Sequence, residues 1–131
     1  MTLGDYKMVV RSNKLVVVID DDHLVLEATE TLLRSWGCRV VAAKSCLEAM
    51  KKLFDIGQRP DLIVCDYRLA HGRSGIDAIE ILREAFEIPA LLVSADTNPP
   101  GSNVSGAGFF LLHKPVDAQK FRAALIEAAV L

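Results

Sequence analysis

The sequence predicts an α/β fold, a doubly wound sheet of five parallel strands with helices on both faces. Two observations support this prediction. Short apolar runs rich in β-branched residues alternate along the chain with longer segments whose apolar residues recur at helical spacing. The chain has 131 residues, 51% of them hydrophobic, which suits a single domain with its own core.

Five apolar segments are predicted to be strands, and the most apolar of them have the composition of strands covered on both faces. They are residues 14–20 (KLVVVID), 38–43 (CRVVAA), 61–66 (DLIVCD), 90–95 (ALLVSA) and 108–115 (GFFLLHKP). Right-handed crossovers between them lead to the strand order 2-1-3-4-5, which is flavodoxin-like. We expect residues 14–131 to form this domain and residues 1–13 to be a flexible tail or linker.

Four segments are predicted to be helices, because apolar residues recur in them every three or four positions. They are residues 22–36, 45–54, 74–86 and 117–131. Side chains typical of helix starts open three of them: Asp22, Ser45 with Glu48 three positions later, and Asp117. These residues therefore mark where three of the four predicted helices begin.

Residues 96–108 (DTNPPGSNVSGAG) depart from this alternation, because they lie where the fourth crossover helix belongs. They contain two prolines and three glycines, and both residue types disfavour helix. We expect the fourth helix to be shortened or replaced by a loop.

Charge and composition exclude several classes of function. A formal net charge of −2 gives no general attraction to nucleic acid or to an anionic membrane. The apolar run from Leu15 to Ile19 is too short to span a bilayer, and the first residues lack the apolar region of a signal peptide. We therefore expect a cytoplasmic protein without nucleic-acid or direct membrane contact.

Polar side chains stand at the carboxyl ends of four predicted strands. Asp20 and Asp21 end the first strand, Asp66 the third, Ser94 the fourth and Lys114 the fifth. Parallel strands end at one edge of the sheet, so these side chains are expected to converge there. Carboxylates that meet at one place need a cation, and hard oxygen ligands suit Mg²⁺.

The same residues suggest phosphoryl chemistry. A carboxylate beside a divalent ion is a candidate nucleophile, and Asp66 would form an aspartyl phosphate. The hydroxyl of Ser94 and the ammonium of Lys114 would bind the phosphoryl oxygens and stabilise the charge that develops on them. Asp22 has a simpler interpretation as the N-cap of the helix that follows it.

The segments VVVIDDD, PDLIVCDYRL, LLVSA and LHKPV resemble, in order and spacing, the receiver domain of two-component response regulators. The resemblance covers residues 14–130. It implies that Asp66 is the phosphoacceptor and Asp21 a direct metal ligand. It also implies that Asp20 binds the metal through water, and that the backbone carbonyl of Arg68 is a further ligand.

The resemblance implies partners and finer features as well. The expected partner is a histidine kinase or a histidine phosphotransfer domain, and a homodimer is possible. The segments DYRLAHGRSGIDAIEIL and LHKPV look most similar to receivers attached to hybrid sensor histidine kinases. By the same resemblance, Ser94 and Lys114 are the family's hydroxyl and lysine, and the Lys114–Pro115 peptide is expected to be cis. Leu111 departs from the pattern, because the family usually has an aromatic residue there.

Two other functions remain open. The first is a metal-dependent phosphatase. It would use the Asp-x-Asp pair formed by Asp20 and Asp22 at the end of the first strand, with Asp20 as the nucleophile. Against it, Leu24 stands where such enzymes have Thr or Val, and the chain is short for them. The third function is a pseudo-receiver that only binds proteins. In the leading interpretation, the receiver, the chain assists its own modification and is not a turnover enzyme.

Overall fold

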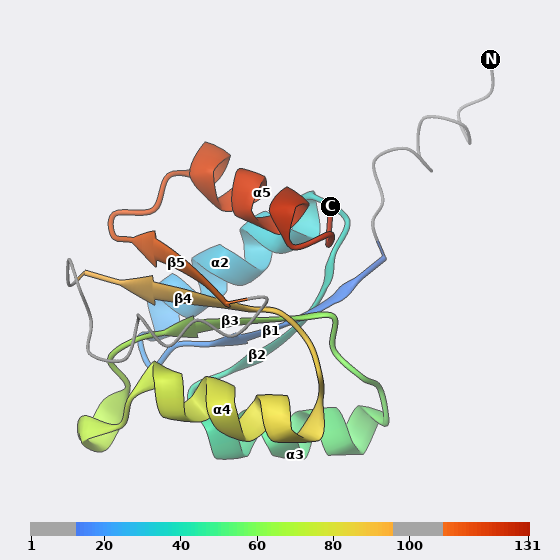
Figure 1. Cartoon of the computed structure of the whole chain (residues 1–131), viewed down its shortest axis with the longest axis vertical. Helices are drawn as coiled ribbons and strands as arrows, with labels where there is room; N and C mark the ends of the chain where they lie inside the picture. The colour runs from blue at the N-terminus through green and yellow to red at the C-terminus, as the bar shows by residue number, and fades with distance from the viewer. Residues whose placement is uncertain (1–12, 96–108) are drawn as a thin grey trace.

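The computed structural model describes residues 13–95 and 109–131, and these form one sheet with helices on both faces (Figure 1). The strands are β1 (Leu15–Ile19), β2 (Arg39–Ala43), β3 (Leu62–Asp66), β4 (Ala90–Ser94) and β5 (Phe109–His113). The helices are α2 (His23–Ser35), α3 (Cys46–Ile56), α4 (Gly75–Ala85) and α5 (Ala118–Glu127), with a short 3₁₀ turn η1 (Ala70–Gly72).

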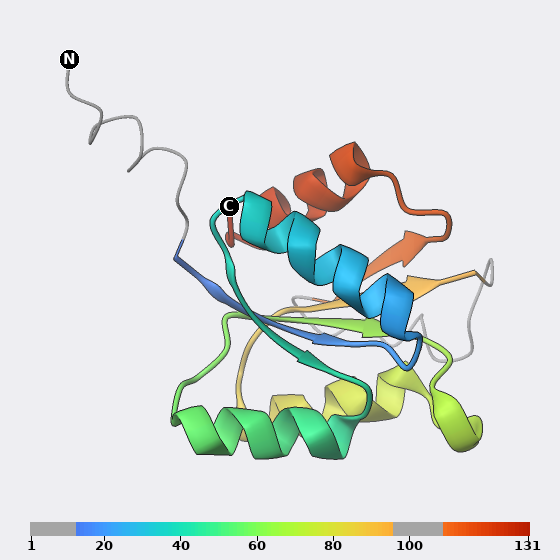
Figure 2. The same ribbon diagram turned by 180° about the vertical axis from the view of Figure 1, so that it is seen from behind.

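The sheet confirms the predicted topology. Its strand order is β2-β1-β3-β4-β5, and all four neighbouring pairs are parallel. Helices α2 and α5 cover one face and α3 and α4 cover the other, as the two opposite views show (Figures 1 and 2). All the strands therefore end at the same edge of the sheet.

The core has two parts, one on each face of the sheet. Alternate residues of β1 divide between them: Val17 and Ile19 face α3 and α4, whereas Val16 and Val18 face α2 and α5. All five residues of β1 are buried. This two-sided burial explains why the strand is a continuous apolar run rather than an alternating one.

Helix starts follow the sequence predictions closely. The Asp22 carboxylate accepts the backbone N–H groups of Leu24 and Val25, and Ser45 Oγ accepts the N–H of Glu48 at 3.1 Å. Asp117 caps α5 in the same way. These side chains satisfy N–H groups that have no partner within the helix.

The end of the last helix differs from the prediction. Helix α5 ends at Glu127, not at residue 131. Ala129 adopts a left-handed conformation with φ of 62°, and the Val130 N–H donates to the Leu125 carbonyl at 2.9 Å. This turn buries Val130 against the core, which compensates for the shorter helix.

Both ends of the described chain lie at the edge of the sheet where the strands begin. Asn13 lies two residues before the start of β1, and its N–H donates to the Gly37 carbonyl at 3.2 Å. Helix α5 runs back across the sheet, so that Leu131 comes to the same side (Figure 1). The opposite edge, where the strands end, carries the predicted site.

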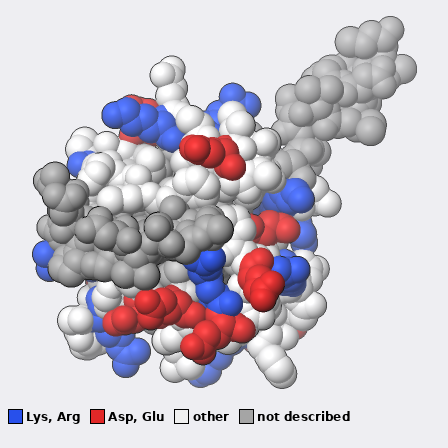
Figure 3. All heavy atoms as spheres, in the orientation of Figure 1, with Lys and Arg blue, Asp and Glu red and all other residues white. Residues whose placement is uncertain are grey.

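Two sequence predictions fall largely outside the described residues. The expected loop at 96–108 lies outside them, and so does the expected tail at 1–13 except for Asn13. Within the described part of the chain, none of the helices is both long and apolar enough to cross a membrane. Charges of both signs are interspersed on the face shown in Figure 3.

Candidate functional site

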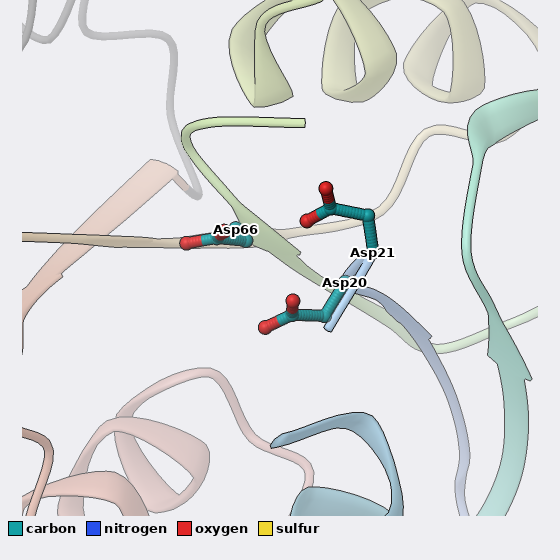
Figure 4. A group of neighbouring side chains, drawn as sticks. All are labelled: Asp20, Asp21 and Asp66. Carbon is teal, nitrogen blue, oxygen red and sulfur yellow. The ribbon is translucent and has the colours of Figure 1, made fainter. Parts of the chain in front are cut away.

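Three carboxylates meet at the carboxyl edge of the sheet. Asp20 and Asp21 directly follow β1, and Asp66 is the last residue of β3. Since Ile19 pairs with Cys65, the residues that follow are brought side by side. One oxygen from each of the three carboxylates lies within 4.8 Å of the others, and the side chains point to a common region (Figure 4).

The three carboxylates differ in exposure. Asp20 is buried at 6% exposure, Asp66 is half-buried and Asp21 is exposed. Burial, together with repulsion from Asp66 and Asp21, raises the pKa of Asp20 to about 6. A hydrogen bond from the Asp22 N–H to Asp20 Oδ1, at 2.9 Å, and the charge of Lys114 oppose this rise.

Lys114 brings a positive charge to the same place. Its Nζ lies 2.9 Å from Oδ1 of Asp66, and the Asp66 side chain is only 11% exposed. Burial works against the charge of Lys114, but the hydrogen bond to Asp66 and the attraction of the nearby aspartates raise its pKa overall. The lysine is therefore held as a cation against the central carboxylate.

Ser94 is placed one residue beyond the level of Asp66. Asp66 pairs with Val93 in the sheet, so Ser94 follows at the carboxyl end of β4, where it is 1% exposed. Its carbonyl accepts the Lys114 N–H at 2.8 Å. The Lys114–Pro115 peptide is cis, as expected. The backbone thus fixes Lys114 next to Ser94.

Arg68 lies in the exposed loop that follows β3. It forms an isolated antiparallel bridge with Ser74, and its guanidinium carbon is 5.8 Å from the ring centroid of Tyr67. The role of its backbone carbonyl as a metal ligand stays a prediction. The bridge nevertheless shows that the loop folds back on itself close to Asp66.

The donor set fits a hard divalent cation. Carboxylate oxygens are the ligands that Mg²⁺ prefers, and the three aspartates offer them from two adjacent strand ends. Burial, and to a smaller extent repulsion from the other two carboxylates, raises the pKa of Asp20, so its negative charge is costly without a cation. Asp20, Asp21 and Asp66 are therefore the residues that would hold Mg²⁺.

Sequence reasoning missed an apolar pocket that opens beside these residues. It lies between α2 and α5, has a volume of about 470 Å³, and reaches Asp20, Asp66 and Lys114 at one end. Its other walls include Val25, Leu32, Val116 and Phe121. The packing of two helices that are distant in sequence creates this space, so no local sequence pattern predicts it.

Comparison of the sequence with protein families shows which family the chain belongs to. The family model of the response regulator receiver domain matches residues 16–126. The chain belongs to this receiver family. Family membership is thus consistent with the observed strand order and with the position of the acidic site at the carboxyl edge.

Curated relatives of this receiver domain are longer proteins. The phyllosphere-induced regulator PhyR of Methylorubrum extorquens is 27% identical over 113 residues, which cover 86% of this chain and 42% of PhyR. The transcriptional regulatory protein ZraR of Klebsiella oxytoca is 36% identical over 121 residues, covering 86% of this chain and 26% of ZraR. The chain thus spans less than half the length of these relatives.

Solved structures show the same fold. The solution structure of the Erythrobacter litoralis PhyR REC domain has a TM-score of 0.77 and 25% identity, covering 89% of this chain and 90% of that one. A receiver domain protein from Clostridium thermocellum has a TM-score of 0.76 at 22% identity, covering 88% and 93%. Receiver domains are generally signalling modules rather than turnover enzymes.

Proposed function

We propose that this receiver domain accepts a phosphoryl group on Asp66 in a Mg²⁺-dependent step and then changes its interaction surface. The donor is a phosphohistidine of a histidine kinase or of a histidine phosphotransfer domain. The observation that supports this function best is the position of Asp66, which has two further carboxylates on one side and Lys114 Nζ at 2.9 Å.

In the proposed transfer each of these residues has one role. An Asp66 carboxylate oxygen attacks the phosphorus, the P–N bond to the donor imidazole breaks, and the imidazole nitrogen takes the electron pair. Lys114 is placed to pair with a phosphoryl oxygen once the Asp66 oxygen that it contacts has become part of the acyl phosphate. The Ser94 hydroxyl is proposed to donate to another phosphoryl oxygen. Mg²⁺ held by the three carboxylates would supply further positive charge for the transferred phosphoryl group.

Metal binding is assigned to the acidic side chains and one carbonyl. Asp21 and Asp66 are proposed as direct ligands, Asp20 as a ligand through water, and the Arg68 carbonyl as a further protein ligand. The convergence of the three carboxylates within 4.8 Å supports the first part of this assignment. A site that keeps ligand positions open to water and phosphate suits Mg²⁺.

Phosphorylation of Asp66 is tested directly by intact mass. Protein incubated with acetyl phosphate and Mg²⁺ should gain the mass of one phosphoryl group, and EDTA should prevent the gain. Asp66→Asn should abolish it, whereas Asp55→Asn, on the exposed surface of α3, should leave it unchanged. Labelling that persists in Asp66→Asn would contradict the proposal. Turnover of a phosphomonoester that depends on Asp20 would instead support the phosphatase, which family membership disfavours.

A second candidate is a protein-binding module that needs no phosphoryl group. One related structure is described as the anti-anti-sigma factor PhyR from Bartonella quintana, with a TM-score of 0.72 at 24% identity, covering 97% of this chain and 52% of that one. The intact acidic site and its lysine favour the phosphoacceptor. Attachment to a hybrid sensor histidine kinase remains a proposal, since the curated relatives named above are regulators. Formation of a homodimer is also a proposal.

A further inference from the structure

The first residue of α4 lies directly against the backbone of Asp66. A methyl carbon placed on Gly75 would be 2.1 Å from the carbonyl oxygen of Asp66 and 2.9 Å from its carbonyl carbon. It would also lie 3.1 Å from Cδ1 of Leu92. Two of these atoms belong to the backbone of a central strand, so they cannot turn aside as a flexible side chain can.

Hydrogen bonds hold the two segments in this close approach. The Gly75 N–H donates to the Tyr67 carbonyl at 2.7 Å, and the Tyr67 N–H donates to the Val93 carbonyl at 2.8 Å. Ser74 Oγ accepts the Ile76 N–H at 3.1 Å and so fixes where the helix begins. The start of α4 is thereby tied to the residue that follows Asp66, and that residue is itself tied to β4.

The requirement for glycine here is one of space. Gly57 and Gly72 have φ of 64° and 70°, and a methyl carbon on either would have nothing within 4 Å. Gly75 has no positive φ, but it is the position where a methyl group would meet the strand. At Gly57 and Gly72 a side chain would strain the backbone, whereas at Gly75 it would collide with neighbouring atoms.

We propose that Gly75 is a positioning residue for the Asp66 carboxylate. Its lack of a side chain allows the start of α4 to hold the Asp66 peptide at the distance that directs the carboxylate toward Asp20, Asp21 and Lys114. This inference rests on the proposed function, because it concerns the same metal and phosphoryl site.

A methyl group at position 75 would force the Asp66 peptide and α4 apart by roughly 1 Å, starting from the 2.1 Å contact. Asp20 and Asp21 follow the end of a different strand, β1, so they would not follow this movement. The spacing of the three carboxylates and the 2.9 Å contact with Lys114 would both change. Misplacement of this size lowers the rate of a positioned reaction by up to about a hundredfold.

The test compares Gly75→Ala with Gly57→Ala. Both substitutions are expected to lower stability, the second because alanine is strained at positive φ. Isothermal titration with Mg²⁺ should show a roughly tenfold weaker affinity in Gly75→Ala alone. Acetyl phosphate labelling per folded molecule should also slow in that variant alone. Affinity and rate equal to those of the wild type in folded Gly75→Ala would overturn the positioning role.

A second pair of variants serves if Gly75→Ala does not fold. Ser74→Ala and Ser45→Ala each remove one helix N-cap whose oxygen accepts an N–H at 3.1 Å. Only the cap at Ser74 holds the helix start that touches Asp66, so only its loss should weaken Mg²⁺ binding. Equal Mg²⁺ affinity in both variants would overturn the inference.

Measurements on the wild-type protein distinguish failure of the positioning role from failure of the proposed function. Wild-type protein that binds Mg²⁺ and becomes labelled at Asp66, with variants at Gly75 and Ser74 that behave like it, refutes the positioning role only. Wild-type protein that neither binds Mg²⁺ nor becomes labelled refutes the proposed function, and with it the need to position Asp66.

Discussion

Asp20 combines burial with like charge, and this makes it the most sensitive titratable residue of the site. Its pKa is raised from 3.8 to about 6, first by burial and then by Asp66 and Asp21. Between these two pH values the folded chain keeps a proton on Asp20 that the unfolded chain has lost. Without metal, the free energy of unfolding should therefore fall as the pH rises from about 4 to about 6.

Replacement of this carboxylate should stabilise the metal-free protein at neutral pH. We expect Asp20→Asn in EDTA to raise the free energy of unfolding by about 1–2 kcal/mol at pH 8 and by less at pH 5. Urea denaturation at the two pH values measures the difference. Asp21→Asn, at an exposed position, is the control and should change stability less. An Asp20→Asn variant no more stable than the wild type at pH 8 would contradict this account.

Lys114 should affect the phosphoryl step far more than the fold. Its ammonium is the positive charge that contacts Asp66, so Lys114→Ala should slow labelling by acetyl phosphate about a hundredfold. Lys120→Ala removes the same charge from an exposed position on α5 and should leave the rate unchanged. Rates are obtained from intact mass against time, and an unaltered rate in Lys114→Ala would exclude this role.

At the scale of elements, the edge strand β2 is protected by two cationic side chains from opposite faces of the sheet. Arg34 Nη2 on α2 donates to the Val40 carbonyl at 3.2 Å, and Lys52 Nζ on α3 donates to the Ala42 carbonyl at 2.7 Å. Each cation also pairs with a glutamate four residues earlier on its own helix. Backbone carbonyls that an added strand could use are thus occupied.

Removal of both cations should make the chain associate through β2. We expect Arg34→Met with Lys52→Met to sediment as larger species at concentrations where the wild type does not, with little loss of stability. Lys51→Met, an exposed substitution on the same helix that leaves the edge covered, is the control. Sedimentation velocity over a range of concentrations measures the effect, and unchanged sedimentation of the double variant would refute it.

The sequence predicted the strands better than the ends of the helices, and the reason is physical. Runs such as residues 15–19 are buried on both faces, so their composition alone indicates a central strand. The acidic residues could be placed because parallel strands end together. The end of α5 depends on the burial of Val130. The need for glycine at position 75 depends on its contact with the backbone of Asp66. Both are tertiary effects that no local pattern contains.

For the molecule as a whole, Mg²⁺ should act as a stabilising ligand. A ligand that binds only the folded chain adds about 2.7 kcal/mol when its free concentration is about a hundredfold above its Kd. The gain should be smaller at pH 5, because protons compete for Asp20 below its pKa of about 6. Thermal unfolding with Mg²⁺ or EDTA at pH 5 and pH 8 measures it, with Asp66→Asn as the variant expected to lose most of the gain. Equal gains at both pH values would contradict the role of Asp20.

The location of Asn13 and Leu131 has a consequence for any larger assembly. Asn13 and Leu131 lie at the edge of the sheet remote from Asp66. A neighbouring domain fused at either point would lie at the edge of the sheet opposite Asp66, and it would not obstruct the approach of a bulky phosphodonor. The same domain can therefore be part of proteins of quite different lengths without any change at the edge of the sheet that carries Asp66.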